Sequence, residues 1–371
     1  MNVLEVGELR VKPWLYQVTA YEPGKPISEV QREYGLTDVI KMASNENPFG
    51  CSPRVLKALE HCYGDLAIYP DGSAYNLRQA VSRHLGVAPE RLIFGNGSDE
   101  LISILCRSLL DAESEAVMAD VTFSRYKDNV LIEGARPVEV PLRDGTHDLA
   151  AMAAAVTPKT KIVWVCNPNN PTGTYVSHEE VLRLLQSVPS DCVVVLDEAY
   201  YEYHTADDYP HAIPLLDQYP NLVLLRTFSK AYGLAALRVG YGVMQPELID
   251  ILNRIREPFN VNSLAQEAAL AALEDQDFLQ NSCRRNAEGL QMLAEGAKAM
   301  GLDYFPSQAN FLMIHVHRSA DEVFHSLLRE GVIVRSGDFL GVPQTIRVTV
   351  GTEAQNRRLL QALQKVLEGS R

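Results

Sequence analysis

The sequence predicts an α/β protein, in which a mostly parallel sheet carries helices on both faces and a smaller α+β lobe is attached. Between residues 92 and 243, short apolar runs alternate with segments of helical pattern. This alternation is typical of parallel sheets, whose strands are joined by helical crossovers. Several runs are apolar at consecutive positions, as in strands covered on both faces. After Gly301 a shorter alternation predicts the second lobe.

The elements of the larger lobe follow in order along the chain. Ser52 and Pro53 are expected to open a helix, with serine as N-cap and proline at the first helical position. Ser73 is expected to cap a second helix that runs through Leu85. The predicted strands are 92–94, 116–118, 137–140, 162–166, 192–196, 222–225 and 239–243. The other predicted helices are 101–110, 149–156, 178–186, 247–256, 264–273 and 277–300.

The ends of the chain differ from this central part. The first fifty residues contain several Pro and Gly residues and no strong periodicity, which predicts an extended arm. The C-terminal elements are predicted as strands 311–316, 332–335 and 346–350 and helices 320–329 and 353–367. We therefore expect three parts: an arm over 1–49 that packs with the small lobe, a large domain over 50–260, and a helical connection with a small domain over 261–371.

Composition excludes several classes of function. The 371 residues include 34 Lys+Arg and 47 Asp+Glu, so the formal net charge of −13 repels nucleic acid and anionic membranes. No apolar segment reaches the roughly 20 residues of a membrane-spanning helix, and the acidic N-terminal segment does not resemble a signal peptide. The six cysteines are scattered, which signals neither a metal site nor disulfides. We expect a cytoplasmic protein without a bound metal.

Polar side chains follow several of the predicted strands. Ligands of open parallel sheets bind beyond the carboxyl ends of the strands, so these positions are candidates for a site. The turn 167–173 is either purely structural or holds the Asn170 amide toward the cleft. Asp197 ends a very apolar strand and needs a partner, because burying an unpaired carboxylate costs several kcal/mol. Tyr200 follows three residues later.

A lysine and a candidate anion site complete this set. Lys230 lies between two apolar strands; taken alone, it is expected to be a solvated loop lysine. The segment 97–99 precedes a helix, whose free N–H groups and dipole favour an anion. Ser229 and Arg238 could bind the same anion. Phe123 is either a core residue or the cover of a flat ligand.

Together these residues suit pyridoxal phosphate. This cofactor needs a lysine for its aldehyde, a carboxylate for its ring nitrogen, donors for its phenolate oxygen and an anion site for its phosphate. In that order, the candidates are Lys230; Asp197; Tyr200 with Asn170; and Gly97, Ser98 and Asp99 with Ser229 and Arg238.

Longer motifs match a known family in order and spacing. They are Asn-Pro-Asn-Asn-Pro-Thr-Gly at 167–173, Asp-Glu-Ala-Tyr at 197–200 and Ser-Lys-Ala-Tyr-Gly-Leu-Ala-Ala-Leu-Arg-Val-Gly at 229–240. They resemble those of the fold-type-I pyridoxal-phosphate aminotransferases. More narrowly, Ala-Ser-Asn-Glu-Asn-Pro at 43–48, Tyr-Pro-Asp-Gly at 69–72, Gly-Asn-Gly-Ser-Asp-Glu at 95–100 and Leu-Arg-Thr-Phe-Ser-Lys at 225–230 resemble the histidinol-phosphate aminotransferases.

The resemblance implies a role for each cofactor residue. Lys230 would bind the cofactor covalently and then act as the base that moves the substrate proton. Asp197 would pair with the pyridinium nitrogen, and Asn170 and Tyr200 with the phenolate oxygen. Phe123 falls where the family places a stacking aromatic, often a tyrosine. The resemblance completes the cofactor-binding set with Gly97, Ser98, Asp99, Thr227, Ser229 and Arg238.

The resemblance also implies a homodimer and a substrate site. Tyr69 would reach across the dimer interface to the cofactor phosphate of the partner subunit. Arg347 matches the arginine that binds the substrate carboxylate, or the equivalent end of the pocket for histidinol phosphate. Arg335, Tyr21 and Asn45 are further candidates for the substrate.

The implied reaction is amino transfer between L-histidinol phosphate and 2-oxoglutarate, which yields imidazole-acetol phosphate and glutamate in histidine biosynthesis. An aromatic-amino-acid aminotransferase is the main alternative, and a phosphothreonine decarboxylase shares much of the scaffold. A non-catalytic regulator with a fused DNA-binding segment fits the acidic chain poorly. A nucleotide-binding Rossmann protein is disfavoured because the segment 95–100 lacks the third glycine of that fingerprint.

Overall fold

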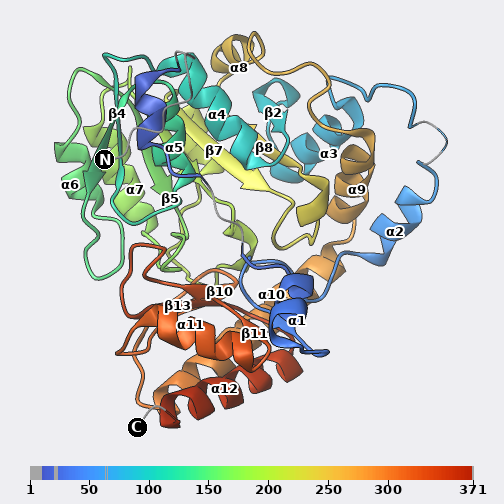
Figure 1. Cartoon of the computed structure of the whole chain (residues 1–371). Coiled ribbons are helices and arrows are strands. Elements are labelled where there is room, and N and C mark those ends of the chain that lie inside the picture. The colour runs from blue at the N-terminus through green and yellow to red at the C-terminus, as the bar shows by residue number, and fades with distance from the viewer. Residues whose placement is uncertain (1–10, 21–23, 63, 65, 370–371) are drawn as a thin grey trace.

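The computed structural model describes residues 11–20, 24–62, 64 and 66–369. Its larger lobe is built on a seven-stranded sheet of order β2-β8-β7-β6-β5-β3-β4 (Figure 1). Neighbouring strands from β7 to β4 are parallel, and β8 runs antiparallel to both of its neighbours. The prediction of a mostly parallel sheet is therefore confirmed. The strands are β2 Leu92–Gly95, β3 Glu115–Ala119, β4 Arg136–Val140, β5 Thr160–Cys166, β6 Val193–Asp197, β7 Leu222–Thr227 and β8 Gly240–Val243.

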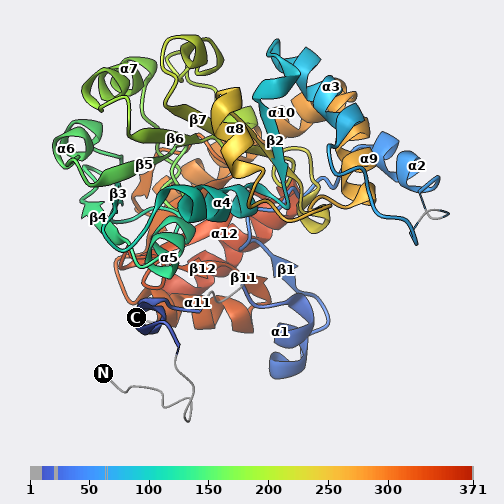
Figure 2. The same cartoon turned by 90° about the horizontal axis from the view of Figure 1, so that it is seen from above.

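Helices cover both faces of this sheet. Successive strand residues point to opposite faces, so in β5 Val163 packs with one cluster of apolar side chains and Trp164 with the other. The first cluster includes residues of α6 (Leu149–Ala154) and α7 (His178–Ser187). The second includes residues of α4 (Ser98–Leu109), α5 (Arg125–Ile132) and α8 (Pro246–Leu252). Figure 2 shows α4 and α5 on one side of the sheet and α6 and α7 on the other.

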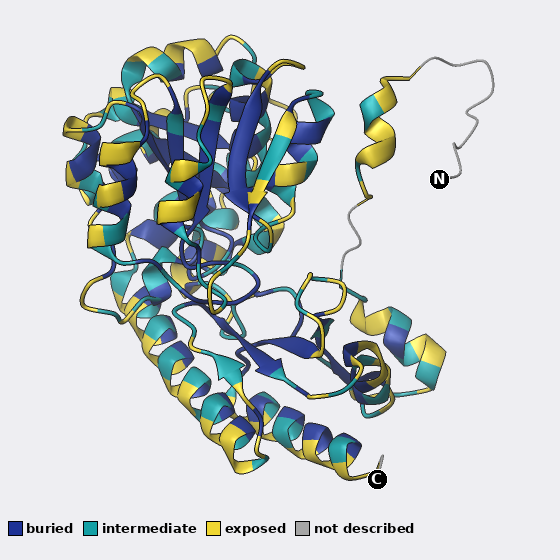
Figure 3. Cartoon of the chain, turned by 90° about the vertical axis from the view of Figure 1, so that its left-hand side faces the viewer, coloured by how far each residue is buried: buried dark blue, intermediate teal, exposed yellow. Residues whose placement is uncertain are grey.

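The smaller lobe contains an antiparallel sheet of order β12-β13-β10-β9. Figure 3 shows its buried strands separated from those of the larger sheet. Its strands are β9 Tyr304–Phe305, β10 Phe311–His315, β12 Arg335–Ser336 and β13 Thr345–Thr349. The helices beside it are α10 Gln276–Ala299, α11 Ala320–Arg329 and α12 Glu353–Glu368.

The N-terminal segment is more regular than an extended arm. It contains the helix α1 (Ile27–Tyr34) and the strand β1 (Ile40–Lys41). β1 pairs in parallel with β11 (Val332–Ile333), so the part of the segment from α1 to β1 lies beside the small lobe (Figure 1). The short helix before it, Pro13–Gln17, instead lies beside α5 of the large lobe, where Trp14 Nε1 donates to the Ile132 carbonyl at 2.9 Å. The proposed division at residues 49 and 260 stays a prediction.

One helix cap differs from the sequence prediction. Ser52 caps α2 (Pro53–Leu59) by accepting the Arg54 N–H, as expected. In contrast, the N-cap of α3 (Tyr75–Leu85) is Ala74 rather than Ser73. The Asp71 carboxylate accepts N–H groups on both sides of this position, from Ser73 and Tyr75, both at 2.8 Å. The helix start is therefore held by an aspartate three residues before the N-cap. The remaining helix of the large lobe is α9 Ser263–Leu273.

Among the described residues, the structure contains no helix with the length and apolar character needed to cross a bilayer.

Candidate active site

A cavity of about 540 Å³ opens at the carboxyl ends of the parallel strands. Side chains of the small lobe and of the N-terminal segment line it opposite the sheet. Tyr69 is not part of its lining, Gly97 lies in the turn before α4, and Tyr21 is outside the described residues. The predicted residues that line the cavity are Asn45, Ser98, Asp99, Phe123, Asn170, Asp197, Tyr200, Thr227, Ser229, Lys230, Arg238, Arg335 and Arg347.

Lys230 follows β7 and lines this cavity. Its Nζ is 5.8 Å from the centroid of the Tyr200 ring. Burial, followed by the positive charge of Arg347, lowers the pKa of Lys230 to about 8. A substantial fraction of the amine is therefore neutral and nucleophilic near neutral pH.

Asp197 is the last residue of β6 and is only 2% exposed. Its Oδ1 accepts the Ala199 N–H at 3.2 Å, and its Oδ2 accepts the Tyr126 hydroxyl at 2.7 Å. Burial raises the pKa of Asp197 to about 6, against the hydrogen bond from Tyr126. The carboxylate thus has the partners that its position at the end of an apolar strand requires.

Tyr126 is a site residue that the sequence did not reveal. It lies in the first turn of α5, a short helix that was not predicted. Its ring stacks on Trp164 at 4.8 Å between centroids and meets Phe123 edge-on at 5.6 Å. The spacing of three residues between Phe123 and Tyr126 is the only sequence signal that could have linked the two aromatics.

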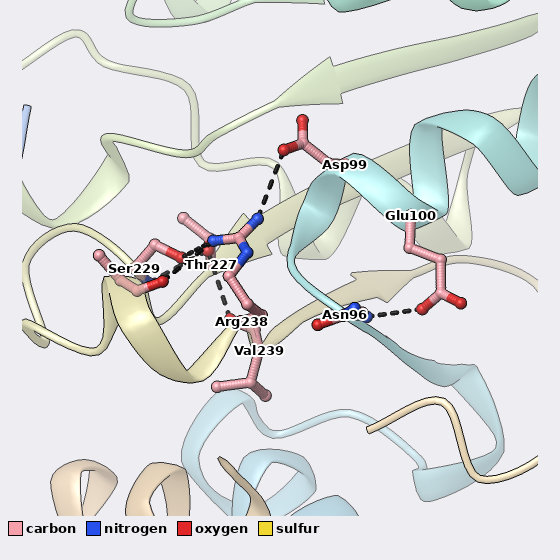
Figure 4. A network of polar contacts seen from close by, with 8 residues as sticks. Asn96, Asp99, Glu100, Thr227, Ser229, Arg238 and Val239 are labelled. Carbon is pink, nitrogen blue, oxygen red and sulfur yellow. Dashed lines mark hydrogen bonds and ion pairs between the residues drawn. The ribbon is translucent and has the colours of Figure 1, made fainter. Parts of the chain in front are cut away.

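The turn before α4 and the guanidinium of Arg238 form a second part of the site (Figure 4). Arg238 Nη1 donates to Ser229 Oγ at 3.3 Å, and Nη2 contacts Asp99 Oδ2 at 3.4 Å. Gly97 is the N-cap of α4, and no side chain of the described residues caps this helix there. The first N–H groups of the helix are therefore available to an anion.

Backbone conformation brings Arg238 to this turn. Arg238 itself has a left-handed backbone with φ 56°, and Gly97 has φ 77°. A Cβ at Gly97 would lie 2.6 Å from Arg238 Nη2, so only glycine leaves room for the guanidinium. Thr227 Oγ1 accepts the Ser229 N–H at 3.1 Å and donates to the Val239 carbonyl at 3.3 Å, which holds the two strands around the turn (Figure 4).

Tyr200 is oriented by residues that are distant in the sequence. Asn45 Nδ2 donates to the Tyr200 hydroxyl at 3.0 Å, and Asn45 Oδ1 accepts from Thr349 Oγ1 at 3.1 Å. Burial raises the pKa of Tyr200, which keeps its hydroxyl protonated. Asn45, predicted as a substrate residue, lines the cavity and also fixes the phenol.

Two arginines lie on the small-lobe side of the cavity. Arg347 is buried; its Nη1 donates to Asn170 Oδ1 at 2.5 Å and its Nη2 to the Ala43 carbonyl at 2.9 Å. The guanidinium of Arg335 lies 4.8 Å from the centroid of the Phe339 ring. This side of the cavity is therefore positively charged.

A buried ion pair that was not predicted joins the ends of β6 and β7. Arg226 donates from Nε and Nη2 to Glu198 Oε2, both at 2.8 Å. Its guanidinium also stacks over Tyr201, 3.6 Å from the ring centroid. Because Asp197 precedes Glu198 and Lys230 follows this strand end, the pair fixes the spacing of the two strands that carry them.

Tyr69 lies on the surface, away from these groups. Its side chain is 78% exposed and stacks on Phe259 at 4.7 Å between ring centroids.

The donor set of the cavity fits pyridoxal phosphate. It combines a partly neutral lysine, a buried carboxylate, a phenol beside an amide, and a helix N-terminus next to an arginine. These are the groups that the aldehyde, ring nitrogen, phenolate and phosphate of this cofactor require.

Known proteins resemble this chain along nearly its whole length. Residues 37–363 match the model of the aminotransferase class I and II family. The histidinol-phosphate aminotransferases of Halalkalibacterium halodurans and Bacillus subtilis are 55% and 53% identical, each over 97% of this chain and over 97% and 100% of their own lengths. A crystal structure of histidinol-phosphate aminotransferase from Sinorhizobium meliloti in complex with pyridoxal-5'-phosphate is 30% identical, with a TM-score of 0.90 over 99% of this chain and 100% of that one. The chain therefore belongs to the class I and II aminotransferases.

Proposed function

We propose that this aminotransferase transfers an amino group between L-histidinol phosphate and 2-oxoglutarate, in histidine biosynthesis, with pyridoxal 5'-phosphate as cofactor. The observation that carries the proposal is the cavity, in which Lys230, Asp197 and the N-terminus of α4 face one space with two arginines opposite. The names of the relatives at 53–55% identity support the same substrate.

Each part of the cofactor has residues to hold it. Lys230 would bind it covalently, Asp197 would pair with its ring nitrogen, and Asn170 with Tyr200 would bind its phenolate oxygen. Phe123 would cover one face of its ring. When bound, the cofactor supplies an aldehyde that carries the amino group and a ring that withdraws electrons from the reacting carbon. The residues proposed for its phosphate are Gly97, Ser98, Asp99, Thr227, Ser229 and Arg238.

Lys230 also moves the proton in this proposal. Its Nζ would take the proton from the substrate α-carbon and then give it to the former aldehyde carbon of the cofactor. The lowered pKa of Lys230, about 8, suits a base at physiological pH because the neutral form is the one that accepts a proton. The low exposure of the surrounding groups keeps water away from the reacting atoms.

The two arginines explain how one pocket serves both substrates. Glutamate carries two carboxylates, whereas histidinol phosphate carries a phosphate and an imidazole. Arg347 and Arg335 lie on the same side of the cavity and bind anions of either kind. Asn45, and Tyr21 outside the described residues, complete the proposed substrate set.

An aromatic amino acid is the second candidate substrate. The observation that favours it is the apolar part of the lining, which includes Phe123, Phe339 and Leu340; the Phe339 ring lies 4.8 Å from the Arg335 guanidinium. A pocket of this kind accepts a phenyl ring as well as an imidazole, since similar side chains differ by only about 1–3 kcal/mol of contacts.

We also infer that the enzyme works as a homodimer. Leu66, Ile68, Tyr69 and Tyr75 are large apolar side chains that are all more than half exposed within one short segment. Clustered exposure of this kind is typical of an interface.

The scattered cysteines support a cytoplasmic location, where disulfides are rare.

The test of the cofactor uses Lys230→Ala. The wild-type protein is expected to gain visible absorbance with pyridoxal phosphate, and borohydride is expected to fix the label on the peptide that contains Lys230. Lys230→Ala loses the fixed label and nearly all turnover, because no other group is proposed to bind the cofactor covalently. A wild-type protein that remains colourless with the cofactor would refute the proposal.

Kinetics then decide between the substrates. With 2-oxoglutarate as acceptor, kcat/KM for histidinol phosphate is expected to exceed that for phenylalanine by at least about tenfold, because a phosphate carries more negative charge toward the two arginines than a carboxylate does. A higher kcat/KM for phenylalanine would favour the second candidate.

A further inference from the structure

The contact between Tyr126 and Asp197 has a geometry that a purely structural tyrosine does not need. The Tyr126 hydroxyl donates to Asp197 Oδ2 at 2.7 Å, and both residues are buried. The Tyr126 ring is held by stacking on Trp164 and by the edge contact with Phe123. The phenol therefore cannot turn away from the carboxylate without losing two aromatic contacts.

This bond acts on the proton affinity of Asp197. Two negative charges raise the pKa of Asp197 in addition to burial: Asp99 from α4 and Glu198, the next residue in the chain. Cys166 lies beside Asp197 on β5 and is kept protonated by burial, which raises the pKa of its thiol to about 12. Among the groups that act on Asp197, Tyr126 is the side chain that donates a hydrogen bond to it. Burial and the charge of Asp197 raise the pKa of Tyr126 itself, so the phenol stays a donor.

We propose that Tyr126 is a positioning residue for the reaction, whose hydroxyl keeps Asp197 ionised and aimed at the ring nitrogen of pyridoxal phosphate. The inference rests on the proposed function, because it requires that Asp197 pairs with this nitrogen. A carboxylate that already accepts a hydrogen bond is a weaker base, so the shared proton stays on the ring nitrogen. Removal of the hydroxyl moves the proton toward Asp197 and weakens the ionic pair.

The test compares two ligands in Tyr126→Phe, a variant that retains the aromatic ring. The ligands are pyridoxal phosphate and its 1-deaza analogue, in which a C–H group replaces the ring nitrogen. Tyr126→Phe is expected to bind pyridoxal phosphate about 10- to 100-fold more weakly than the wild type, as for the loss of a hydrogen bond to a charged group. The affinity of the analogue is expected to change by less than about threefold, because Asp197 has no charged partner in that complex.

The pH dependence supplies a second readout. Protonation of Asp197 removes its charge, so the affinity for pyridoxal phosphate falls as the pH falls through the pKa of Asp197. Without the Tyr126 hydroxyl this pKa is higher, and the fall is expected to begin at a higher pH in Tyr126→Phe. In the Asp197→Asn background, Tyr126→Phe is expected to have little further effect on affinity, since the two substitutions act on one interaction.

Tyr209→Phe is the matched control. Tyr209 is also buried and also donates its hydroxyl, but to the Asn167 carbonyl rather than to Asp197. The Tyr209→Phe variant is expected to be less stable than the wild type, with an unchanged ratio between its affinities for pyridoxal phosphate and the 1-deaza analogue. Equal weakening of both ligands by Tyr126→Phe, or unchanged affinity for pyridoxal phosphate, would overturn the inference while leaving the proposed function intact. A wild-type protein that binds neither ligand would refute both.

Discussion

The charge state of Lys230 is set by its surroundings rather than by its own chemistry. A pKa of about 8 in place of 10.5 gives about 300-fold more neutral amine at pH 7, since each unit is a factor of ten. Burial is the first cause of this shift and the charge of Arg347 is the second. The arginine therefore has an effect on the lysine in addition to its proposed contact with substrate.

This effect predicts a pH profile for cofactor capture. The rate at which the apoprotein takes up pyridoxal phosphate is expected to rise with pH and to reach half of its plateau near pH 8, where half of Lys230 is neutral. In Arg347→Gln the pKa of Lys230 moves up toward 10.5, so the midpoint moves to higher pH. Stopped-flow absorbance measures the rate. Arg335→Gln is the control, because Arg335 lines the same cavity but is not a cause of the shift; equal midpoints in all three proteins would contradict the prediction.

Single residues were predictable where they end a strand. Asp197 stands out in the sequence because it ends an apolar run, and Lys230 because it lies between two such runs. Their partners do not stand out. Tyr126 reaches Asp197 across 71 residues, and Asn45 reaches Tyr200 across 155. A single sequence carries no signal for such pairs, because they depend on how elements pack and not on local pattern.

At the scale of elements, Asn169 joins the two loops that flank the cavity. Its Oδ1 accepts from Thr122 Oγ1 at 2.8 Å and lies 3.0 Å from His147 Nε2, and its Nδ2 donates to the Val121 carbonyl at 3.1 Å. Burial lowers the pKa of His147 to about 4, so its neutral ring can donate from Nε2. Phe123 follows Thr122 and Asn170 follows Asn169, so this amide fixes the positions of both.

Asn169→Ala is therefore expected to damage both stability and cofactor binding. It leaves four polar groups without this partner, and two of them, on His147 and Thr172, are buried. We expect a loss of about 2 kcal/mol or more, since each buried group without a partner costs about 1–3 kcal/mol. Denaturant unfolding of the apoprotein and titration with pyridoxal phosphate measure the two effects. Asn221→Ala is the control. This buried amide precedes β7 and donates to the carbonyl of Cys192, which precedes β6, at 2.8 Å, so it lies at the opposite ends of the strands from the cavity. Asn221→Ala should lose stability but retain affinity for pyridoxal phosphate. Retained affinity in Asn169→Ala would contradict the role of Asn169 in positioning Phe123 and Asn170.

Elements were predictable where hydrophobic periodicity is strong. The alternation of strand and helix patterns predicted the seven strands of the large sheet at their observed places. The helix predicted over 320–329 is α11. In contrast, α5 has eight residues, and its short amphipathic pattern begins directly after a loop. The cap of α3 was misplaced because Asp71 accepts N–H groups from a position before the helix, so that Ala74 occupies the N-cap.

At the scale of the molecule, the site depends on chain ends that meet. β1 near the N-terminus pairs with β11 of the small lobe, and Asn45 follows β1 directly into the cavity. The sequence predicted two lobes from the change of pattern, and a strand over 332–335 that contains β11. It did not predict the pairing with β1, because a strand of two residues has too little pattern to recognise. The cavity is thus complete only when the N-terminal segment, the large sheet and the small lobe are assembled together.

The proposed homodimer adds a prediction about which subunit supplies Tyr69. Tyr69 is exposed and is not part of the cavity lining of its own chain, so we expect it to serve the site of the partner subunit. Tyr69→Ala and Lys230→Ala, each expected to be strongly impaired, are unfolded together, refolded and assayed. A mixed dimer then has one site with both residues intact, and random pairing restores about a quarter of wild-type activity. Refolding each variant alone is the control. If Tyr69 served its own subunit, no mixed dimer would contain an intact site, and activity would stay at the level of the separate variants.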